Sequence, residues 1–156
     1  MKKFKPVTKS LRHTAIVSYR GVITAKEPHK ALTTGFKRGT GHNAFGRMTT
    51  RHKGGGHKRS YREIDFRMQK FDIPAKIETI EYDPNRSGFI GLICYTDGER
   101  RYNLLPKGLK VGDKIIAGLT AEVKPGNRVP LNKVPVGTFV FNVELQPNGG
   151  ARIARS

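Results

Sequence analysis

The chain changes character within one stretch, Arg51-His52-Lys53-Gly54-Gly55-Gly56-His57-Lys58-Arg59-Ser60-Tyr61-Arg62-Glu63-Ile64-Asp65-Phe66. Residues 1–62 carry a formal charge of +15, from 16 Lys and Arg residues against the single acid Glu27. Residues 63–156 carry only +3, from 14 basic residues against 11 acids. Nearly all of the excess charge of +18 therefore lies on a segment with little apolar sequence to fold around. Such a segment requires a polyanionic partner.

The three consecutive glycines at the centre of this stretch have no Cβ atoms, so bare backbone can approach a phosphate chain closely and donate N–H groups to it. Cationic and imidazole side chains lie on both sides of them. The alternative is a flexible hinge inside a solvated linker. The residues concerned are Arg51, His52, Lys53, Gly54, Gly55, Gly56, His57, Lys58 and Arg59.

The overall composition bounds the class of protein. The chain has 156 residues, 36% of them hydrophobic, no Trp and a pI near 10.5. These values predict one domain or two small ones with a nucleic-acid partner. A membrane partner is not expected, because no apolar run is long enough to span a bilayer and Gly, Pro and His interrupt the basic region.

The single Cys94 lies in an apolar run and is expected to behave as a small core hydrophobe. No disulfide can form within the sequence given, which fits a reducing compartment. The first residues, Met1 to Lys9, lack the hydrophobic stretch of a secretory signal, so we expect the start of a mature protein.

Residues 1–60 are expected to form an extended basic RNA-binding arm. Residues 1–50 show no sustained helical period, so their backbone order would have to come from outside the chain. We expect residues 1–60 to be largely disordered without RNA. Phe36 and Phe45 interrupt the basic run, and their rings would either stack on bases or anchor the arm against the rest of the protein.

Residues 61–126 contain short apolar runs separated by turn residues, which is the pattern of a small closed barrel such as an OB-fold. A phase slip between Ile77 and Ile80 indicates a β-bulge. Asp83–Gly88 and Asp97-Gly98 have turn chemistry. The expected strands are Tyr61–Phe66, Ala75–Tyr82, Phe89–Thr96, Glu99–Leu105, Lys114–Ala117 and Ala121–Val123.

Residues 127–156 open a second β segment, whose main apolar run is Thr138–Leu145. One or two strands cannot bury a core by themselves. The pattern therefore predicts an incomplete second unit, and a mainly β fold overall.

Three ordered motifs carry a resemblance to a known family. They are Met48-Thr49-Thr50-Arg51-His52-Lys53-Gly54-Gly55-Gly56-His57-Lys58, then Tyr82-Asp83-Pro84-Asn85-Arg86-Ser87, and finally Pro135-Val136-Gly137-Thr138 with Gly149-Gly150 and Ala154-Arg155-Ser156. From about Phe4 to Ser156 the sequence resembles the family of large-ribosomal-subunit protein two, of bacterial or organellar type. The resemblance implies an N-terminal arm, an OB barrel and an SH3-like second barrel, of which residues 127–156 would be the beginning.

The resemblance also implies a function. The chain would be a structural constituent of the large ribosomal subunit that binds large-subunit rRNA and supports assembly near the peptidyl-transfer region, beside other ribosomal proteins. It would work in a bacterial cytoplasm or an organelle matrix such as that of a mitochondrion. Arg86 and Arg155 match motif arginines that the family uses for RNA contact. The full set of expected RNA-binding residues is Arg47, Arg51, His52, Lys53, Gly54, Gly55, Gly56, His57, Lys58, Arg59, Arg62, Arg86, Arg152 and Arg155.

Family members continue well beyond the position of Ser156. We therefore expect a separate chain to supply the missing strands and complete the second barrel in trans. The alternative is that the sequence is a piece of a longer protein.

Two other function classes remain open, a free-standing OB-type translation factor and a ribonuclease that uses His52 and His57 as acid and base. The five histidines suggest no zinc site, because one distant Cys and no clustered carboxylates accompany them. We expect no catalytic residue, metal or cofactor. Four basic residues of the barrel either face solvent or form a second contact with RNA. They are Arg100, Arg101, Lys107 and Lys110.

Overall fold

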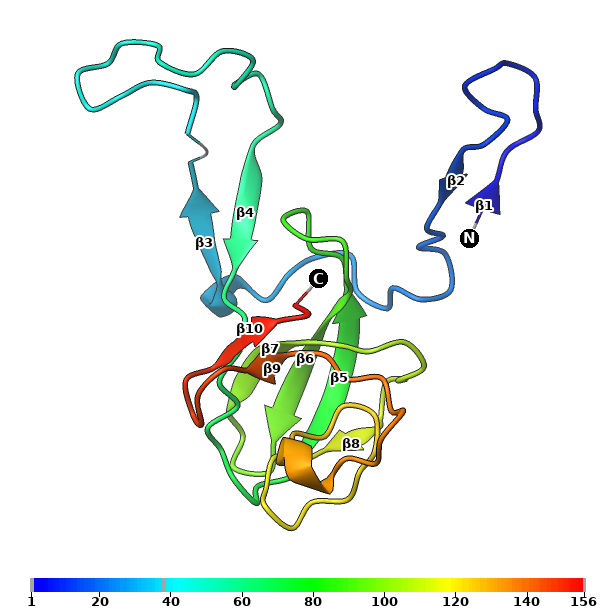
Figure 1. The fold of residues 1–156 in the computed structure, drawn as a ribbon, viewed down its shortest axis with the longest axis vertical. Helices are drawn as coiled ribbons and strands as arrows, with labels where there is room; N and C mark the ends of the chain where they lie inside the picture. The colour runs from blue at the N-terminus through cyan, green and yellow to red at the C-terminus, as the bar shows by residue number, and fades with distance from the viewer. Residues whose placement is uncertain (1, 38, 156) are drawn as a thin grey trace.

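The central element of the computed structural model, which describes residues 2–37 and 39–155, is a curled four-stranded antiparallel sheet (Figure 1). Its strand order is β7-β6-β5-β8. The mainly β fold with an OB-type barrel is confirmed. The strands are β5 (Ala75–Glu81), β6 (Ile90–Tyr95), β7 (Arg100–Leu104) and β8 (Lys114–Ile115).

The register of this sheet follows the apolar pattern of the sequence. The pairing of β5 with β6 shifts between Ile77 and Thr79, so the expected bulge is confirmed. The connection from β6 to β7 turns at the predicted place, where the N–H of Tyr95 donates to the carbonyl of Glu99 at 2.9 Å. Gly98 takes a φ of 88° in this turn, a conformation that favours glycine.

The sheet is buried on both faces. Ile90 and Leu92 belong to one apolar cluster, and Ile93 and Tyr95 belong to another, as the alternation of side chains along a strand requires. The first cluster also contains Tyr102, whose exposed fraction is 0%. Burial of each large apolar side chain stabilises the fold by about 1.5–3 kcal/mol.

The strand expected at Tyr61–Phe66 is displaced. Strand β4 covers Arg59–Arg62 and pairs antiparallel with β3 (Thr33–Phe36), not with the barrel strands. The chain then joins the barrel through Ile64, which forms an isolated parallel bridge with Tyr102. The expectation was wrong because alternation in a sequence identifies a strand but not its partner.

The barrel contains less regular structure than expected. The strand predicted at Lys114–Ala117 is only two residues long, and the segment predicted at Ala121–Val123 is not a strand. Ala117 instead makes isolated bridges to Phe71 and to Arg128. Isolated bridges between loop residues thus replace the regular strand pairing that the sequence pattern predicts.

The N-terminal segment is partly attached to the barrel. Strands β1 (Lys2–Lys3) and β2 (Ala15–Ile16) form an exposed hairpin away from it (Figure 1). Thr24, by contrast, exchanges backbone and side-chain hydrogen bonds with Ile80, and the N–H of His29 donates to the Tyr102 hydroxyl at 2.7 Å. The expectation that backbone order in residues 1–50 comes only from outside the chain is therefore wrong around these contacts.

Two further contacts hold the same segment. The ring of Tyr19 packs edge-on against Tyr82 and Phe89, with centroids 5.1 and 5.9 Å away. The 3-10 helix η1 (Lys30–Leu32) brings Leu32 against the apolar cluster that contains Tyr102. These contacts set the position from which β3 begins.

The C-terminal residues fold back onto the barrel. After the 3-10 helix η2 (Leu131–Lys133), strands β9 (Val143–Glu144) and β10 (Ala151–Ile153) form a hairpin. The Glu144 carboxylate accepts from Arg128, and the N–H of Ala151 donates to the Phe66 carbonyl at 2.9 Å.

Most of the strand expected at Thr138–Leu145 is loop, and only its Val143–Glu144 part pairs. Phe139 is fully exposed in this loop. Among the residues described, no helix is long and apolar enough to cross a membrane.

Candidate nucleic-acid interface

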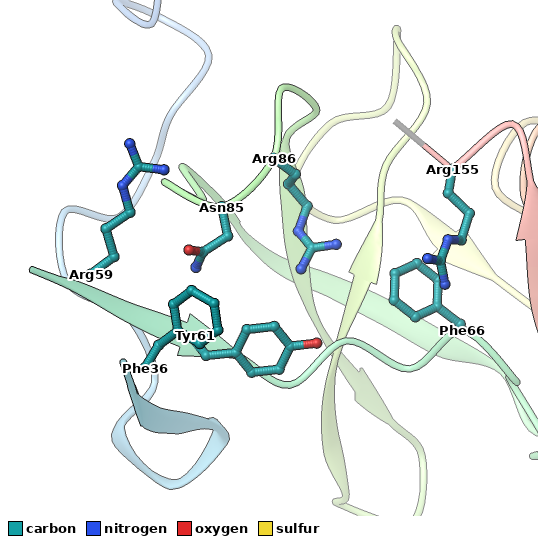
Figure 2. A pocket seen from close by; sticks show the side chains of 7 residues that line it. All are labelled: Phe36, Arg59, Tyr61, Phe66, Asn85, Arg86 and Arg155. Atoms are coloured by element: carbon teal, nitrogen blue, oxygen red, sulfur yellow. The ribbon is translucent and has the colours of Figure 1, made fainter. Parts of the chain in front are cut away.

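A cleft of about 470 Å³ lies between the β3–β4 hairpin and the barrel (Figure 2). It brings together three of the expected RNA-binding arginines from three distant parts of the chain, the start of β4, the loop after β5 and the C-terminal end. Three aromatic rings and one amide complete its lining. The residues are Phe36, Arg59, Tyr61, Phe66, Asn85, Arg86 and Arg155.

Arg86 is held in place by a buried acid. Its Nε donates to the carboxylate of Asp83, whose side chain is 0% exposed, while Arg86 itself is 14% exposed. Asp83 also accepts from the backbone N–H of Asn85 at 2.9 Å and from its side-chain amide at 3.1 Å. Within residues 2–37 and 39–155, the terminal nitrogens of Arg86 donate to no protein acceptor. They are available for a bidentate grip on phosphate.

The Phe66 ring lies under two guanidinium groups. The Cζ atom of Arg155 is 4.5 Å from the ring centroid, and that of Arg86 is 5.8 Å from it. Stacking on an aromatic face orients a planar guanidinium and leaves its edge free to donate. Phe66 therefore positions two cations at one end of the cleft (Figure 2).

The other end of the cleft combines a cation with aromatic surface. Arg59 donates to the Pro84 carbonyl at 2.7 Å, and the Asn85 amide donates to the Ser60 carbonyl at 2.8 Å. These two bonds join β4 to the loop after β5. The rings of Phe36 and Tyr61 lie 5.9 Å apart in a tilted arrangement beside them, and Phe36 is 42% exposed. Phe36 thus packs against Tyr61 of β4 and remains partly exposed to solvent in the cleft.

Most of the other expected RNA-binding residues lie outside the cleft. They occupy the long loop between β3 and β4, which extends away from the barrel (Figure 1). Gly54 and Gly55 have φ values of 133° and 65°, a backbone region that side chains disfavour, and a Cβ on either would meet open space. The loop residues are exposed and comprise Arg47, Arg51, His52, Lys53, Gly54, Gly55, Gly56, His57 and Lys58.

The two remaining candidates differ in burial. Arg152 is exposed on β10. Arg62 is half-buried, donates to the Ser60 carbonyl at 2.9 Å, and has a buried Nε without a partner in the part of the chain described. Its charge acts on Tyr102, whose pKa is nevertheless raised, chiefly because burial disfavours the phenolate. Arg62 thus faces the barrel interior as well as the surface.

The opposite charges of the barrel pair with one another. Arg100 donates two hydrogen bonds to Glu78, at 2.8 and 3.0 Å, and lowers the pKa of that carboxyl. Arg101 bonds Glu99 and Asp65, and its hydrogen bond to Glu99 is the main reason that the pKa of Glu99 is lowered. Arg100 and Arg101 each use two guanidinium nitrogens on carboxylates, whereas Arg86 uses only its Nε on Asp83.

Four cleft residues lie outside the predicted RNA-binding set, namely Phe36, Tyr61, Phe66 and Asn85. The sequence pattern places Tyr61 and Phe66 in one barrel strand and gives no sign of a cleft. Asn85 lies in a predicted turn, and its place beside Arg86 is the signal that could indicate a role in the cleft. In the described ranges, no group of three or more His, Cys, Asp or Glu residues could hold a metal ion.

Comparison with known proteins identifies the family of the chain. The family described as "Ribosomal Proteins L2, RNA binding N-terminal domain" matches residues 29–117, more than half of the chain. The chain belongs to this ribosomal L2 family. The matched range contains Arg59 and Arg86 of the cleft, and Arg155 lies beyond it.

Curated members of the L2 family match over the full 156 residues. The chain is 51% identical to the large ribosomal subunit protein uL2 of Acidiphilium cryptum and 53% identical to that of Mesorhizobium japonicum. All of this chain is covered in both comparisons, but only 56% of each relative. The chain thus spans little more than half the length of these two relatives.

Proposed function

We propose that this chain is a structural constituent of the large ribosomal subunit and binds large-subunit rRNA. The observation that carries the proposal is the cleft in which Arg59, Arg86 and Arg155 converge beside aromatic rings. Guanidinium groups recognise phosphate, and exposed rings stack on unpaired bases, so the two together fit RNA. The names of the family and of both relatives support the same assignment.

The RNA surface in this proposal has two parts. The cleft arginines bind the sugar-phosphate backbone of a folded region of the rRNA. The glycine-rich loop between β3 and β4 contacts further phosphates of the same RNA. Residues 1–60 act as the basic arm, residues 61–126 as the OB-type barrel and residues 127–156 as the start of an SH3-like barrel. Arg62 and Arg152 complete the proposed set of contacts. The resemblance adds a role in assembly near the peptidyl-transfer region.

The remaining partners and the location follow from the same assignment. Other ribosomal proteins would surround the chain in a bacterial cytoplasmic ribosome, because both relatives are bacterial. Phe139 and Leu145 lie in an exposed apolar loop. The remaining part of the relatives' sequence, which this chain does not span, would cover this loop, either in the same polypeptide or as a separate chain. Organellar location is the less supported form of the proposal.

Binding to purified rRNA tests the proposal. The chain is expected to bind large-subunit rRNA more tightly than small-subunit rRNA at the same moderate salt concentration, and to remain bound during subunit assembly. Equal affinity for both RNAs would contradict it. Rapid exchange on and off finished subunits would indicate a translation factor, and RNA cleavage lost on replacing His52 or His57 would indicate a ribonuclease.

A further inference from the structure

The loop between β3 and β4 contains a small hydrogen-bonded turn. The Asn43 side-chain oxygen accepts the backbone N–H groups of Phe45 and Arg47 at 3.0 and 2.9 Å, and the Asn43 N–H donates to the Arg47 carbonyl at 2.8 Å. The His42 ring bonds the Gly46 carbonyl at 2.8 Å. The backbone around Phe45 is therefore fixed by several bonds within a few residues.

A second set of bonds closes the base of this turn. The N–H groups of Thr49 and Thr50 both donate to the Gly41 carbonyl, at 2.9 and 3.2 Å. Gly41 has a φ of 81°, and a Cβ there would lie 2.3 Å from the Thr50 carbonyl oxygen. Only glycine fits this position, so the sequence itself specifies the turn.

The turn presents one large apolar side chain to solvent. Phe45 is 89% exposed, whereas Phe36, the other ring of this region, packs against Tyr61. The loop that carries Phe45 extends away from the barrel (Figure 1). The earlier alternative, in which this ring anchors the arm against the barrel, does not apply to Phe45.

The charge around the ring identifies the partner. No acid occurs between Glu27 and Glu63, and Arg47 is bonded into the same turn as Phe45. A polyanion is therefore expected next to the ring. Nucleic acid is a polyanion that also offers flat apolar faces, because unpaired bases stack on aromatic side chains.

We propose that Phe45 is a base-stacking residue, which the hydrogen-bonded turn holds ready to insert against an unpaired base while Arg47 contacts the neighbouring phosphate. This inference rests on the proposed function, since it names how one more part of the chain contacts rRNA. The turn fixes the backbone before binding, so less conformational entropy is lost when the ring stacks. Stacking of one base on one ring strengthens binding by roughly five- to a hundredfold.

Binding affinities for rRNA and for inorganic polyphosphate distinguish base stacking from charge attraction, because only rRNA has bases. Phe45→Ala is expected to weaken binding to large-subunit rRNA by roughly five- to a hundredfold and to leave binding to inorganic polyphosphate, which has no bases, unchanged. Arg47→Ala is expected to weaken both. Asn43→Ala, which releases the turn but keeps the ring, is expected to weaken rRNA binding less than Phe45→Ala. Equal rRNA affinity of Phe45→Ala and the unaltered chain would overturn the inference while leaving the proposed function intact.

Fluorescence tests the contact directly. The chain has no Trp, so Phe45→Trp introduces a unique reporter, and Phe139→Trp places a matched one at another fully exposed aromatic position. Saturating rRNA is expected to quench emission at position 45 but not at 139. Equal quenching at both positions, no quenching at 45, or a response at 45 to anionic phospholipid vesicles alone would refute base stacking. Failure of the unaltered chain to bind rRNA would remove the proposed function and this inference together.

Discussion

Replacement of Arg86 by Ala is expected to destabilise the barrel as well as to weaken RNA binding. The reason is Asp83, whose carboxylate is 0% exposed and loses its ion partner. Removing one member of a buried pair typically costs 3–5 kcal/mol, and a hydrogen bond to a charged group contributes about 1.5–3 kcal/mol. Because Asp83 keeps two N–H donors from Asn85, we expect a loss of about 2–4 kcal/mol in the free energy of unfolding.

Urea denaturation measures this loss. With a slope of about 2 kcal/mol per molar urea, the midpoint should fall by roughly 1–2 M. The double variant Asp83→Asn/Arg86→Ala removes the orphaned charge and is expected to be more stable than Arg86→Ala alone. Arg100→Ala is the control, because its pair with Glu78 is open to solvent and should contribute little to stability.

Two results would refute this reasoning. One is an unfolding free energy of Arg86→Ala that equals the parent value. The other is a double variant no more stable than the single one, which would mean that Asp83 and Arg86 are not energetically coupled.

Four further predictions can be tested with the same protein. Arg155→Ala should weaken large-subunit rRNA binding by about 1–3 kcal/mol in filter binding, whereas Arg100→Ala should leave it nearly unchanged; equal losses would indicate diffuse electrostatics. The logarithm of rRNA affinity should fall steeply with the logarithm of salt concentration, by about 0.7–0.9 per phosphate contacted, and a slope near zero would exclude phosphate contacts. Arg100 lowers the pKa of Glu78 below its ordinary 4.5, so this carboxylate adds stability above about pH 4.5 that is lost as the pH falls further; Glu78→Gln should flatten the acid side of the stability profile. In amide exchange of the free chain, the Thr24 and Ile80 amides should be protected and those of residues 51–58 should exchange fast; the reverse order would contradict the contacts between Thr24 and Ile80.

The barrel could be predicted from sequence because its signals are local. Short apolar runs and the turn residues between them predict β5, β6 and β7 to within one residue at each end, and the phase slip after Ile77 locates the bulge. The N-terminal docking could not be predicted in this way. The contacts of Thr24 with Ile80 and of His29 with Tyr102 join residues 56 and 73 positions apart, and no short-range pattern encodes them.

The candidate site was predicted only in part, for a related reason. The charged flanks of the three glycines predict Arg59, and the family resemblance predicts Arg86 and Arg155. What the sequence did not reveal is convergence: Arg155 reaches the cleft because Ala151 bonds the Phe66 carbonyl and brings the end of the chain beside Phe66. The sequence predicts Asp83 to form a turn, and its second role as the buried partner of Arg86 depends on burial that only the fold creates.

The bond between His29 and Tyr102 has a consequence for the order of events during synthesis. His29 is synthesised 73 residues before its partner Tyr102. At about 5–20 residues per second, this gap lasts roughly 4–15 s. For that time, the basic segment has no barrel to dock on, and its cations are free to meet nascent or mature rRNA first. If the proposed RNA contact forms within that time, docking of residues 24–32 follows it, and the barrel then fastens an arm that is already bound.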